Sequence, residues 1–188
     1  MRAGGFDDGG ETALNKLPRI LTLLLGLLGA GIAAYLTFTH FNIMVDPEFQ
    51  SGCNLGGSLN CDAVNSSQFS EVMGIPIALV GVAFYLAIAA LSILSLLPGQ
   101  DSPRAPAMIW GLSVLAVFLS ACLAFISGAI IGAWCLFCMS LYAVNLALLG
   151  ASWWGAGLSL KPLVKELDLE LRGFYKSPVV YVTLATFL

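Results

Sequence analysis

The chain has 188 residues, of which 59% are hydrophobic and only 10% are charged. Soluble domains carry roughly a quarter charged residues, and polar side chains this sparse cannot coat a water-soluble globule. The composition therefore indicates a membrane protein. The formal net charge of −3 and the lack of a basic stripe in the sequence argue against a nucleic-acid-binding protein.

The N-terminal half contains two predicted membrane spans. Residues 1–19 begin with a Gly- and Asp-rich stretch and are expected to form a disordered terminus. A helix needs about 20 apolar residues to cross the hydrocarbon core, and the runs at about 20–41 and 74–97 meet that requirement. The first run is too long for the apolar part of a cleavable signal peptide, and further spans follow it.

The C-terminal half contains two further predicted spans and the start of another. The stretch 107–154 has no charged residue, and at about 1.5 Å per residue it is about twice as long as the bilayer core requires. It must fold back on itself, and residues 128–132 (GAIIG) are the expected turn. After a charged connection at 155–177, residues 178–188 look like the start of a fifth span that is cut short. The prediction is an all-α protein whose residues 20–154 form a four-helix membrane domain.

The basic residues predict the orientation of these spans. All eight lie in residues 1–19, 98–106 and 155–177, whereas the connection 42–73 has none. Basic residues are enriched on the cytoplasmic side of membrane proteins. The N-terminus is therefore expected to be cytoplasmic, with the connection 42–73 and the 128–132 turn on the outer side.

Four of the five cysteines fall on that outer side. Cys53 and Cys61 lie in the outer connection, and Cys135 and Cys138 follow the outer turn at the start of the fourth span. Helical residues three apart have neighbouring Cβ atoms, so the second pair can close a disulfide with modest adjustment. Such a bridge pins no distant parts of the chain together, so it suits a redox centre better than a structural staple.

The sequence around the cysteines favours reactive thiols. Cys135 is expected near a helix N-terminus, where free N–H groups and the helix dipole stabilise a thiolate. Asn60 is a good N-cap, so Cys61 is expected to open a short helix. The carboxylate of Asp62 works against a reactive Cys61, because an adjacent negative charge raises the pKa of a thiol. Three nearby glycines are expected to keep the segment around Cys53 mobile.

Alternative roles for these residues stay open. The CxxC pair could be two buried apolar thiols, the outer pair could be a purely structural loop bridge, and the four cysteines could bind zinc. Cys122, in the outer half of the third span, is expected to be a small core residue. His40, the only histidine, ends the first span and is expected to be an interfacial polar residue rather than a catalyst.

Two motifs carry a resemblance to a known family. They are CDAVNSSQFSEVMGIP at residues 61–76, which follows the paired loop cysteines, and WCLFCMSLYAVN at residues 134–145. Over about residues 20–154 the chain resembles the vitamin K epoxide reductase family, particularly its bacterial homologues. The resemblance implies a bundle of four transmembrane helices that encloses a quinone next to the CxxC.

The resemblance also implies a relay of cysteines. Cys138 would be the thiol that faces the quinone, and Cys135 its partner in the active-site disulfide. Cys61 would exchange with Cys135, and Cys53 with the external redox partner.

Four residues are implied to contact the quinone: Cys138, Tyr142, Asn145 and Ser67. Ser67 matches a family serine that supports the site. Tyr142 lies one turn past Cys138, where its phenol can hydrogen-bond a quinone carbonyl, or it can simply be a core aromatic. Asn145 lies three residues further along the same face and could equally hold helices together.

The implied function is that of a quinone-coupled thiol–disulfide oxidoreductase in a bacterial inner membrane, which supports disulfide formation in exported proteins. Electrons would pass from a thioredoxin-fold partner through the two cysteine pairs to a quinone of the ubiquinone, menaquinone or phylloquinone type. Bacterial homologues often carry a thioredoxin-like domain after a fifth span. Since this chain stops within what looks like that span, a separate or removed partner is expected.

Three rival functions fit the sequence less well. A DsbB-like quinone-coupled oxidase does the same overall chemistry, but its CxxC lies in the first outer loop, the reverse of the order here. A claudin-type tetraspan scaffold has a structural loop disulfide but needs no CxxC on the fourth span. A transporter needs a buried acid or base to couple an ion, and no predicted span carries one.

Overall fold

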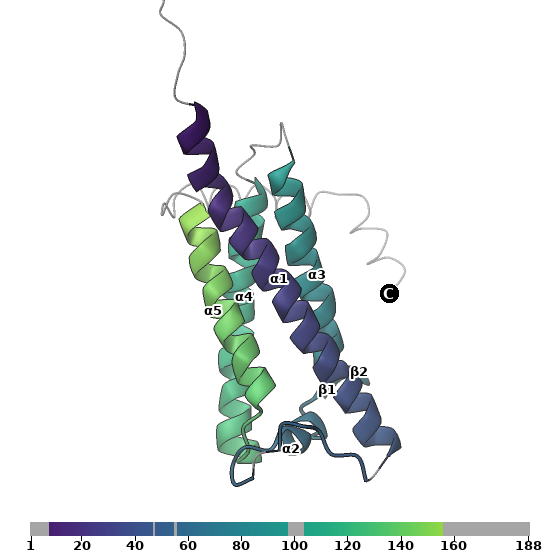
Figure 1. The fold of residues 1–188 in the computed structure, drawn as a ribbon. Helices are drawn as coiled ribbons and strands as arrows, with labels where there is room; N and C mark the ends of the chain where they lie inside the picture. The colour runs from purple at the N-terminus through teal and green to yellow at the C-terminus, as the bar shows by residue number, and fades with distance from the viewer. Residues whose placement is uncertain (1–7, 47, 55, 98–103, 156–188) are drawn as a thin grey trace, which may run out of the picture.

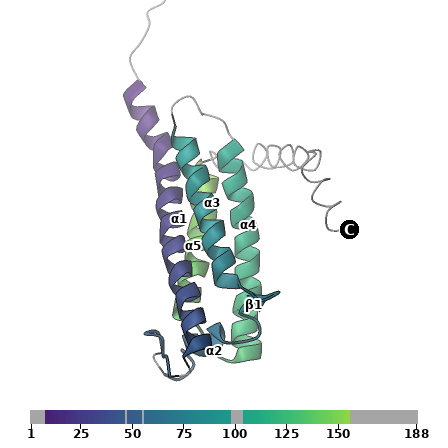
Figure 2. The same cartoon turned by 90° about the vertical axis from the view of Figure 1, so that its right-hand side faces the viewer.

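The computed structural model describes residues 8–46, 48–54, 56–97 and 104–155. Within these ranges four helices are long and apolar enough to cross a membrane. Figure 1 shows them side by side in one bundle, and Figure 2 shows the same bundle from the side. In chain order they are α1 (Asp8–Val45), α3 (Ile77–Leu96), α4 (Arg104–Phe125) and α5 (Leu136–Gly155). The predicted all-α bundle of four apolar helices is confirmed.

The first helix begins earlier than the sequence predicts. Helix α1 starts at Asp8, so residues 8–19 are helical, and assigning all of 1–19 to a disordered terminus was wrong over that part. Residues 11–17 (ETALNKL) are mostly good helix formers, and adding a residue to an existing helix costs far less than starting one. Residues 1–7 lie outside the described residues.

The second span begins later than predicted because a small hairpin precedes it. Strands β1 (Glu71–Val72) and β2 (Ile75–Pro76) pair antiparallel, and α3 starts at Ile77 rather than near residue 74. Met73 and Gly74 form the turn with φ of 56° and 78°. Two consecutive residues of positive φ are typical of the tight turn that suits the twist of paired strands.

The chain turns back between the third and fourth spans as expected, but it does so later than residues 128–132, because residues 126–131 are still helical. Helix α4 continues into a π-helix, η1 (Ile126–Ile131), which ends at Gly132 with φ of +72°. This left-handed conformation favours glycine. Gly128 serves a different need: a Cβ there would lie 2.7 Å from Cζ2 of the Trp134 indole, so only glycine leaves room for that ring. The expected fifth span and most of the connection before it lie outside the described residues.

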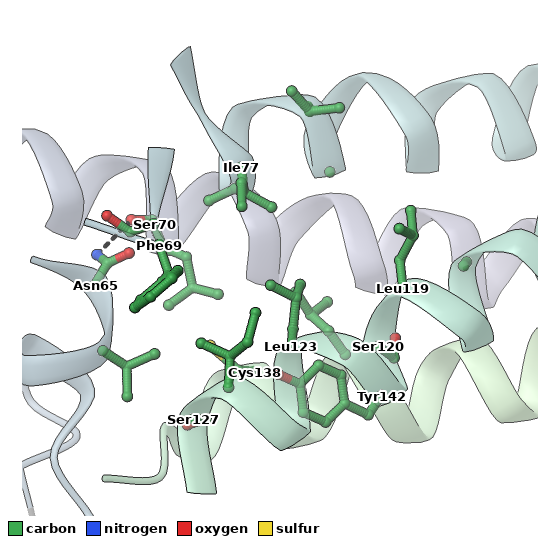
Figure 3. A pocket seen from close by; sticks show the side chains of 18 of the residues that line it. Asn65, Phe69, Ser70, Ile77, Leu119, Ser120, Leu123, Ser127, Cys138 and Tyr142 are labelled. Carbon is green, nitrogen blue, oxygen red and sulfur yellow. Dashed lines mark hydrogen bonds between the residues drawn. The ribbon is translucent and has the colours of Figure 1, made fainter. Parts of the chain in front are cut away.

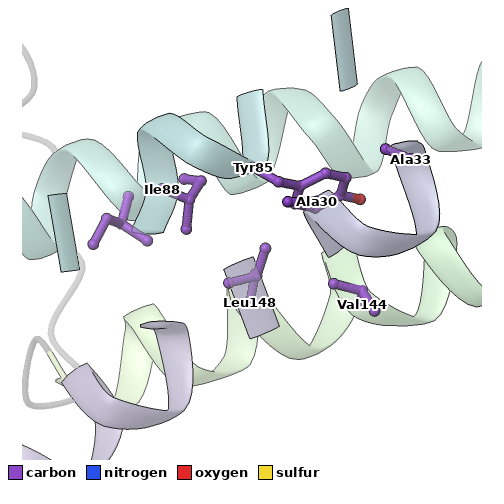
Figure 4. Packing of buried hydrophobic residues seen from close by; sticks show 7 residues of the cluster. Ala30, Ala33, Tyr85, Ile88, Val144 and Leu148 are labelled. Atoms are coloured by element: carbon purple, nitrogen blue, oxygen red, sulfur yellow. The ribbon is translucent and has the colours of Figure 1, made fainter. Parts of the chain in front are cut away.

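The bundle core is small and lies where α1, α3 and α5 meet (Figure 4). Gly29 on α1 packs directly against the ring of Tyr85 on α3, which is buried. Small residues let helix backbones approach closely, which is how helices associate when lipid offers no hydrophobic gain. The buried members of the core are Ala30, Ala33, Tyr85, Ile88, Ile109, Val144 and Leu148.

The outer faces of the helices are strongly apolar. Large side chains such as Leu24, Phe38 and Phe118 are more than half exposed. Water would penalise such a surface heavily, whereas hydrocarbon would not. The distribution of side chains therefore agrees with a bundle surrounded by lipid.

We predict that Gly29→Ala destabilises the bundle. The new Cβ would lie 2.4 Å from Cδ1 of Tyr85, and overpacking of this kind costs roughly 1–3 kcal/mol. We expect the apparent melting temperature in detergent to fall by several degrees. Gly31→Ala on the same helix is the matched control, because its Cβ would meet nothing within 4 Å. Equal melting temperatures for the two variants would contradict the packing argument.

Candidate active site

Backbone hydrogen bonds join the outer connection to Trp134, the residue that precedes the CxxC pair. The backbone N–H of Asn60 donates to the Trp134 carbonyl at 3.0 Å, and the N–H of Trp134 donates to the Ser58 carbonyl at 2.8 Å. Leu59 and Trp134 form a parallel bridge between these two bonds. Two segments far apart in sequence are thereby fixed side by side, one immediately before Cys61 and the other immediately before Cys135.

The first cysteine pair closes a loop next to these hydrogen bonds. Cys53 and Cys61 form a disulfide with a Cα–Cα distance of 5.9 Å. Cys61 is the first residue of a short helix, α2 (Cys61–Asn65), as the sequence predicts. The side chain of Asn60 caps this helix, since its Oδ1 accepts from the Ala63 N–H at 2.9 Å.

The second cysteine pair lies at the start of α5. The sulfur of Cys135 accepts a hydrogen bond from the backbone N–H of Cys138 at 3.2 Å, so it acts as a cap of the helix. The Cys138 thiol also hydrogen-bonds to it, and these contacts lower the pKa of Cys135 below its ordinary value. Burial and the charge of Asp62 oppose that shift without reversing it. Cys135 is thus a buried thiol that favours the thiolate.

All four cysteines of the predicted relay meet in one cluster. Cys53, Cys61 and Cys135 are buried together, and Cys138 packs against them. The convergence expected from topology is therefore present in the structure. Cys122 stands apart: it is exposed on α4, so the expectation of a small core residue was wrong.

Asp62 holds the loop disulfide from one side. Its Oδ2 accepts from the Ser51 backbone N–H at 3.1 Å and from the Asn54 side-chain amide, which flank Cys53. Its other oxygen, Oδ1, is buried and has no hydrogen-bond partner among the described residues. The carboxylate therefore ties the Cys53 segment to helix α2 independently of the disulfide.

His40 is not the interfacial residue that the sequence predicts. Its side chain is only 2% exposed, and its Nδ1 and Nε2 lie 2.8 Å from the Asn65 carbonyl and 2.9 Å from Glu71 Oε1. The side-chain amide of Asn65 in turn donates to the Leu36 carbonyl and to Thr39 Oγ1, both at 3.0 Å. These contacts fasten helix α2 and the hairpin to the end of α1. The sequence could not show this burial, because the residues around His40 that enclose it come from another segment.

A cavity of about 340 Å³ lies beneath helix α2, between α3, α4 and α5 (Figure 3). Most of its wall is aliphatic or aromatic, with a few polar groups. The four residues predicted to contact a quinone all line it: Ser67, Cys138, Tyr142 and Asn145.

The polar groups of the cavity differ in what they can still bind. The Ser67 hydroxyl already donates to the Val64 carbonyl at 2.8 Å, so it offers a ligand only an acceptor. Asn145 is engaged by Tyr85 and Ser120. The Tyr142 hydroxyl makes no hydrogen bond to any described residue and is free to donate. Tyr85 and Ser120 were missed by the sequence reasoning, although a polar side chain within an apolar span is itself a signal of a functional position.

Comparison with known families agrees with this geometry. The vitamin K epoxide reductase family profile matches residues 20–153, which include both cysteine pairs, all of α3 and α4, and most of α1 and α5. The chain belongs to the vitamin K epoxide reductase family. Members of that family are oxidoreductases built as membrane helical bundles.

A quinone, with which the vitamin K epoxide reductase family is generally associated, fits the residues present. A flat apolar ring suits the aliphatic walls, and its carbonyls need hydrogen-bond donors such as Tyr142.

We predict that Cys138→Ala raises the pKa of Cys135, because the thiol of Cys138 is the main group that lowers it. The measurement is ultraviolet thiolate absorbance against pH, in a background where Cys53, Cys61 and Cys122 are replaced by serine. A lowered pKa means that thiolate appears at lower pH, so the first transition should move to higher pH in the variant. Cys138→Ser keeps a hydroxyl donor and should move the transition less. Identical curves for the alanine variant and its parent would refute the assignment.

Proposed function

We propose that this protein is a quinone-coupled thiol–disulfide oxidoreductase. Electrons pass from a thioredoxin-fold partner to Cys53 and Cys61, then to Cys135 and Cys138, and finally to a quinone in the membrane. One observation carries the proposal: three of these cysteines share a buried cluster, and the fourth, Cys138, joins that cluster to the cavity wall.

The first step opens the loop disulfide. A thiolate of the partner attacks Cys53, and Cys61 leaves as a thiolate; the partner's second thiol then resolves the mixed disulfide and leaves Cys53 reduced. The partner loses two electrons and becomes a disulfide, and the loop pair gains them. Cys61 is the first residue of helix α2 and directly follows Asn60, which is hydrogen-bonded to Trp134. Of the two loop cysteines it is therefore the nearer in the chain to the contact with the Cys135 segment.

The second step moves the electron pair to α5. The Cys61 thiolate attacks Cys135 of a Cys135–Cys138 disulfide, and Cys138 leaves as a thiolate. Cys53 then attacks Cys61, which restores the loop disulfide and releases Cys135. Because its pKa is lowered, Cys135 is a good leaving group in this last exchange.

The third step takes place at the cavity. A bound quinone would supply the electron sink: it would take up two electrons and two protons and become a quinol, while the Cys135 and Cys138 thiols lose them and close to a disulfide. Cys138 lies in the cavity wall, and Tyr142, one helical turn further, offers a free hydroxyl to a ring carbonyl. Ser67, which lines the cavity just after helix α2, contributes a hydrogen-bond acceptor. A quinone of the ubiquinone, menaquinone or phylloquinone type has this chemistry.

The cavity wall supports a lipid-soluble ligand. Val80 on α3 and Leu115 and Leu119 on α4 line the cavity, and about half of each side chain is exposed. These residues would face hydrocarbon in a bilayer. A quinone can therefore reach the cavity laterally between α3 and α4 without crossing water.

The site faces the outside of the cell in this proposal. The cysteine cluster lies at the end of the bundle opposite the start of α1 (Figure 1). The basic residues of 1–19 favour a cytoplasmic N-terminus, which puts the connection 42–73 in the periplasm of a bacterial inner membrane. Residues 20–154 would be the catalytic membrane domain, and the net effect would be disulfide formation in exported proteins.

We predict that the double variant Cys53→Ala, Cys138→Ala traps a Cys61–Cys135 disulfide. Oxidised glutathione is added as the oxidant: it takes up the two electrons and two protons of the Cys61 and Cys135 thiols and leaves as two molecules of glutathione. Each remaining cysteine has lost the partner that would resolve the exchange, so the Cys61–Cys135 disulfide should accumulate and be found by mass spectrometry of non-reduced peptides. The control Cys61→Ala, Cys138→Ala should give far less of a Cys53–Cys135 bridge. Equal bridging in both variants would show that the relay has no defined order.

We also predict quinone-dependent turnover by the purified protein. With a reduced thioredoxin-fold donor, the ultraviolet absorbance of the quinone should fall, and Cys138→Ala should abolish the change because no thiolate lies at the cavity. Cys122→Ala should behave like the unmodified protein, since Cys122 lies outside the cluster. If the unmodified protein reduced none of several quinones, the proposed function would be overturned.

A further inference from the structure

Ser120 on α4 bonds differently from most serines of the bundle. Serines within helices usually donate their hydroxyl proton back to a carbonyl of the preceding turn. Three serines of the spans do so over four residues: Ser92 to Ile88, Ser113 to Ile109 and Ser140 to Leu136, at 2.7–3.0 Å. Ser120 lies on the same helix as Ser113, yet its hydroxyl proton has no acceptor among the described residues.

What Ser120 does instead is accept a hydrogen bond. Its Oγ receives the side-chain amide of Asn145 on α5 at 2.9 Å. The carbonyl oxygen of that same amide accepts from the hydroxyl of Tyr85 on α3 at 2.8 Å. All three side chains are at least nine-tenths buried and line the cavity. The hydrogen bonds therefore run in one direction, from α3 through α5 to α4, and end on a hydroxyl whose proton is unused.

Such a chain makes its last member a better donor. Each bond in a series polarises the next, and the effect is larger in a low-dielectric interior than in water. A buried hydroxyl with an unused proton is also costly unless something accepts it. The cavity is the remaining place where an acceptor can lie.

We propose that Ser120 is a second hydrogen-bond donor to the quinone, with Asn145 and Tyr85 as the residues that position it. The inference rests on the proposed function and adds to it the way in which the ring is oriented. Asn145, to which Ser120 is bonded, lies three residues beyond Tyr142 on α5, which is about one helical turn further along the helix. A para-quinone has a carbonyl at each end of its ring, and the two donors serve one end each. Asn145 then acts through Ser120 rather than by contact with the ring.

The experiment compares Ser120→Ala with two matched variants. Ser120→Thr keeps the hydroxyl, and Ser113→Ala removes an equally buried hydroxyl of the same helix that faces its own backbone. The oxidised protein, which cannot turn over, is titrated with ubiquinone- and menaquinone-type quinones to obtain Kd. Infrared spectra of bound quinone with isotope-labelled carbonyls show whether each carbonyl accepts a hydrogen bond.

For Ser120→Ala we expect Kd to rise about tenfold, as for one lost hydrogen bond. One of the two carbonyl bands should return to the frequency of a carbonyl with no donor. Ser120→Thr and Ser113→Ala should leave both bands and Kd as in the unmodified protein. Tyr85→Phe, which removes only the first donor of the chain, should shift the same band part of the way.

Two failures are distinguishable. If the unmodified protein binds no quinone, the proposed function falls and this inference falls with it. If it binds quinone, but Ser120→Ala leaves Kd and both bands unchanged, only the inference about Ser120 is overturned. A Tyr85→Phe spectrum identical to that of the unmodified protein would remove the positioning role of Tyr85 and Asn145.

Discussion

Two backbone hydrogen bonds at Trp134 hold the cysteine chemistry together. They join Ser58 and Asn60 in the outer connection to the residue just before Cys135. Because the bonds use main-chain atoms, they fix the register of the two segments whatever side chains lie around them. The Trp134 indole lies against Gly128, where a larger residue would leave it no room. A relay between two cysteine pairs depends on this register more than on any single thiol.

The polar residues of the bundle are placed where their partners are. Within hydrocarbon, an unpaired polar group costs several kcal/mol, so buried polar side chains are bonded or serve a ligand. Here one group lies around the cavity and under helix α2. A second group, Thr22, Ser92 and Ser95, bonds within and between α1 and α3 nearer the other end of the bundle. His40 belongs to this pattern, since its two ring nitrogens bond to the Asn65 carbonyl of helix α2 and to Glu71 of strand β1.

Sequence alone predicted the features that depend on residue class or on immediate neighbours. The spans follow from hydropathy, and the cap by Asn60 is a contact over three residues. The meeting of the cysteine pairs followed from counting spans and basic residues. The environments of Cys122 and His40 were predicted wrongly, because the direction in which a side chain points depends on how its helix is rotated in the bundle. A helix that is apolar on every face gives no pattern from which to infer that rotation.

Two further features of the structure were not predicted from the sequence: the hairpin before α3 and the hydrogen bonds of Tyr85, Asn145 and Ser120. The last residues of the hairpin carry no charge and run directly into the apolar helix, so hydropathy did not mark where α3 begins. The chain of bonds from Tyr85 to Ser120 joins three helices, and only their packing brings the three side chains together.

The loop disulfide is shielded as well as positioned. Cys53 is only 3% exposed, and Asp62 holds the residues on either side of it through hydrogen bonds. In the proposed relay, a thiol would reach this sulfur only after that short segment moves away from helix α2. A small thiol in solution brings little binding energy to drive such an opening, whereas a protein that docks on the loop could supply it. Burial of this one sulfur would then favour reduction by a protein over reduction by small thiols in solution.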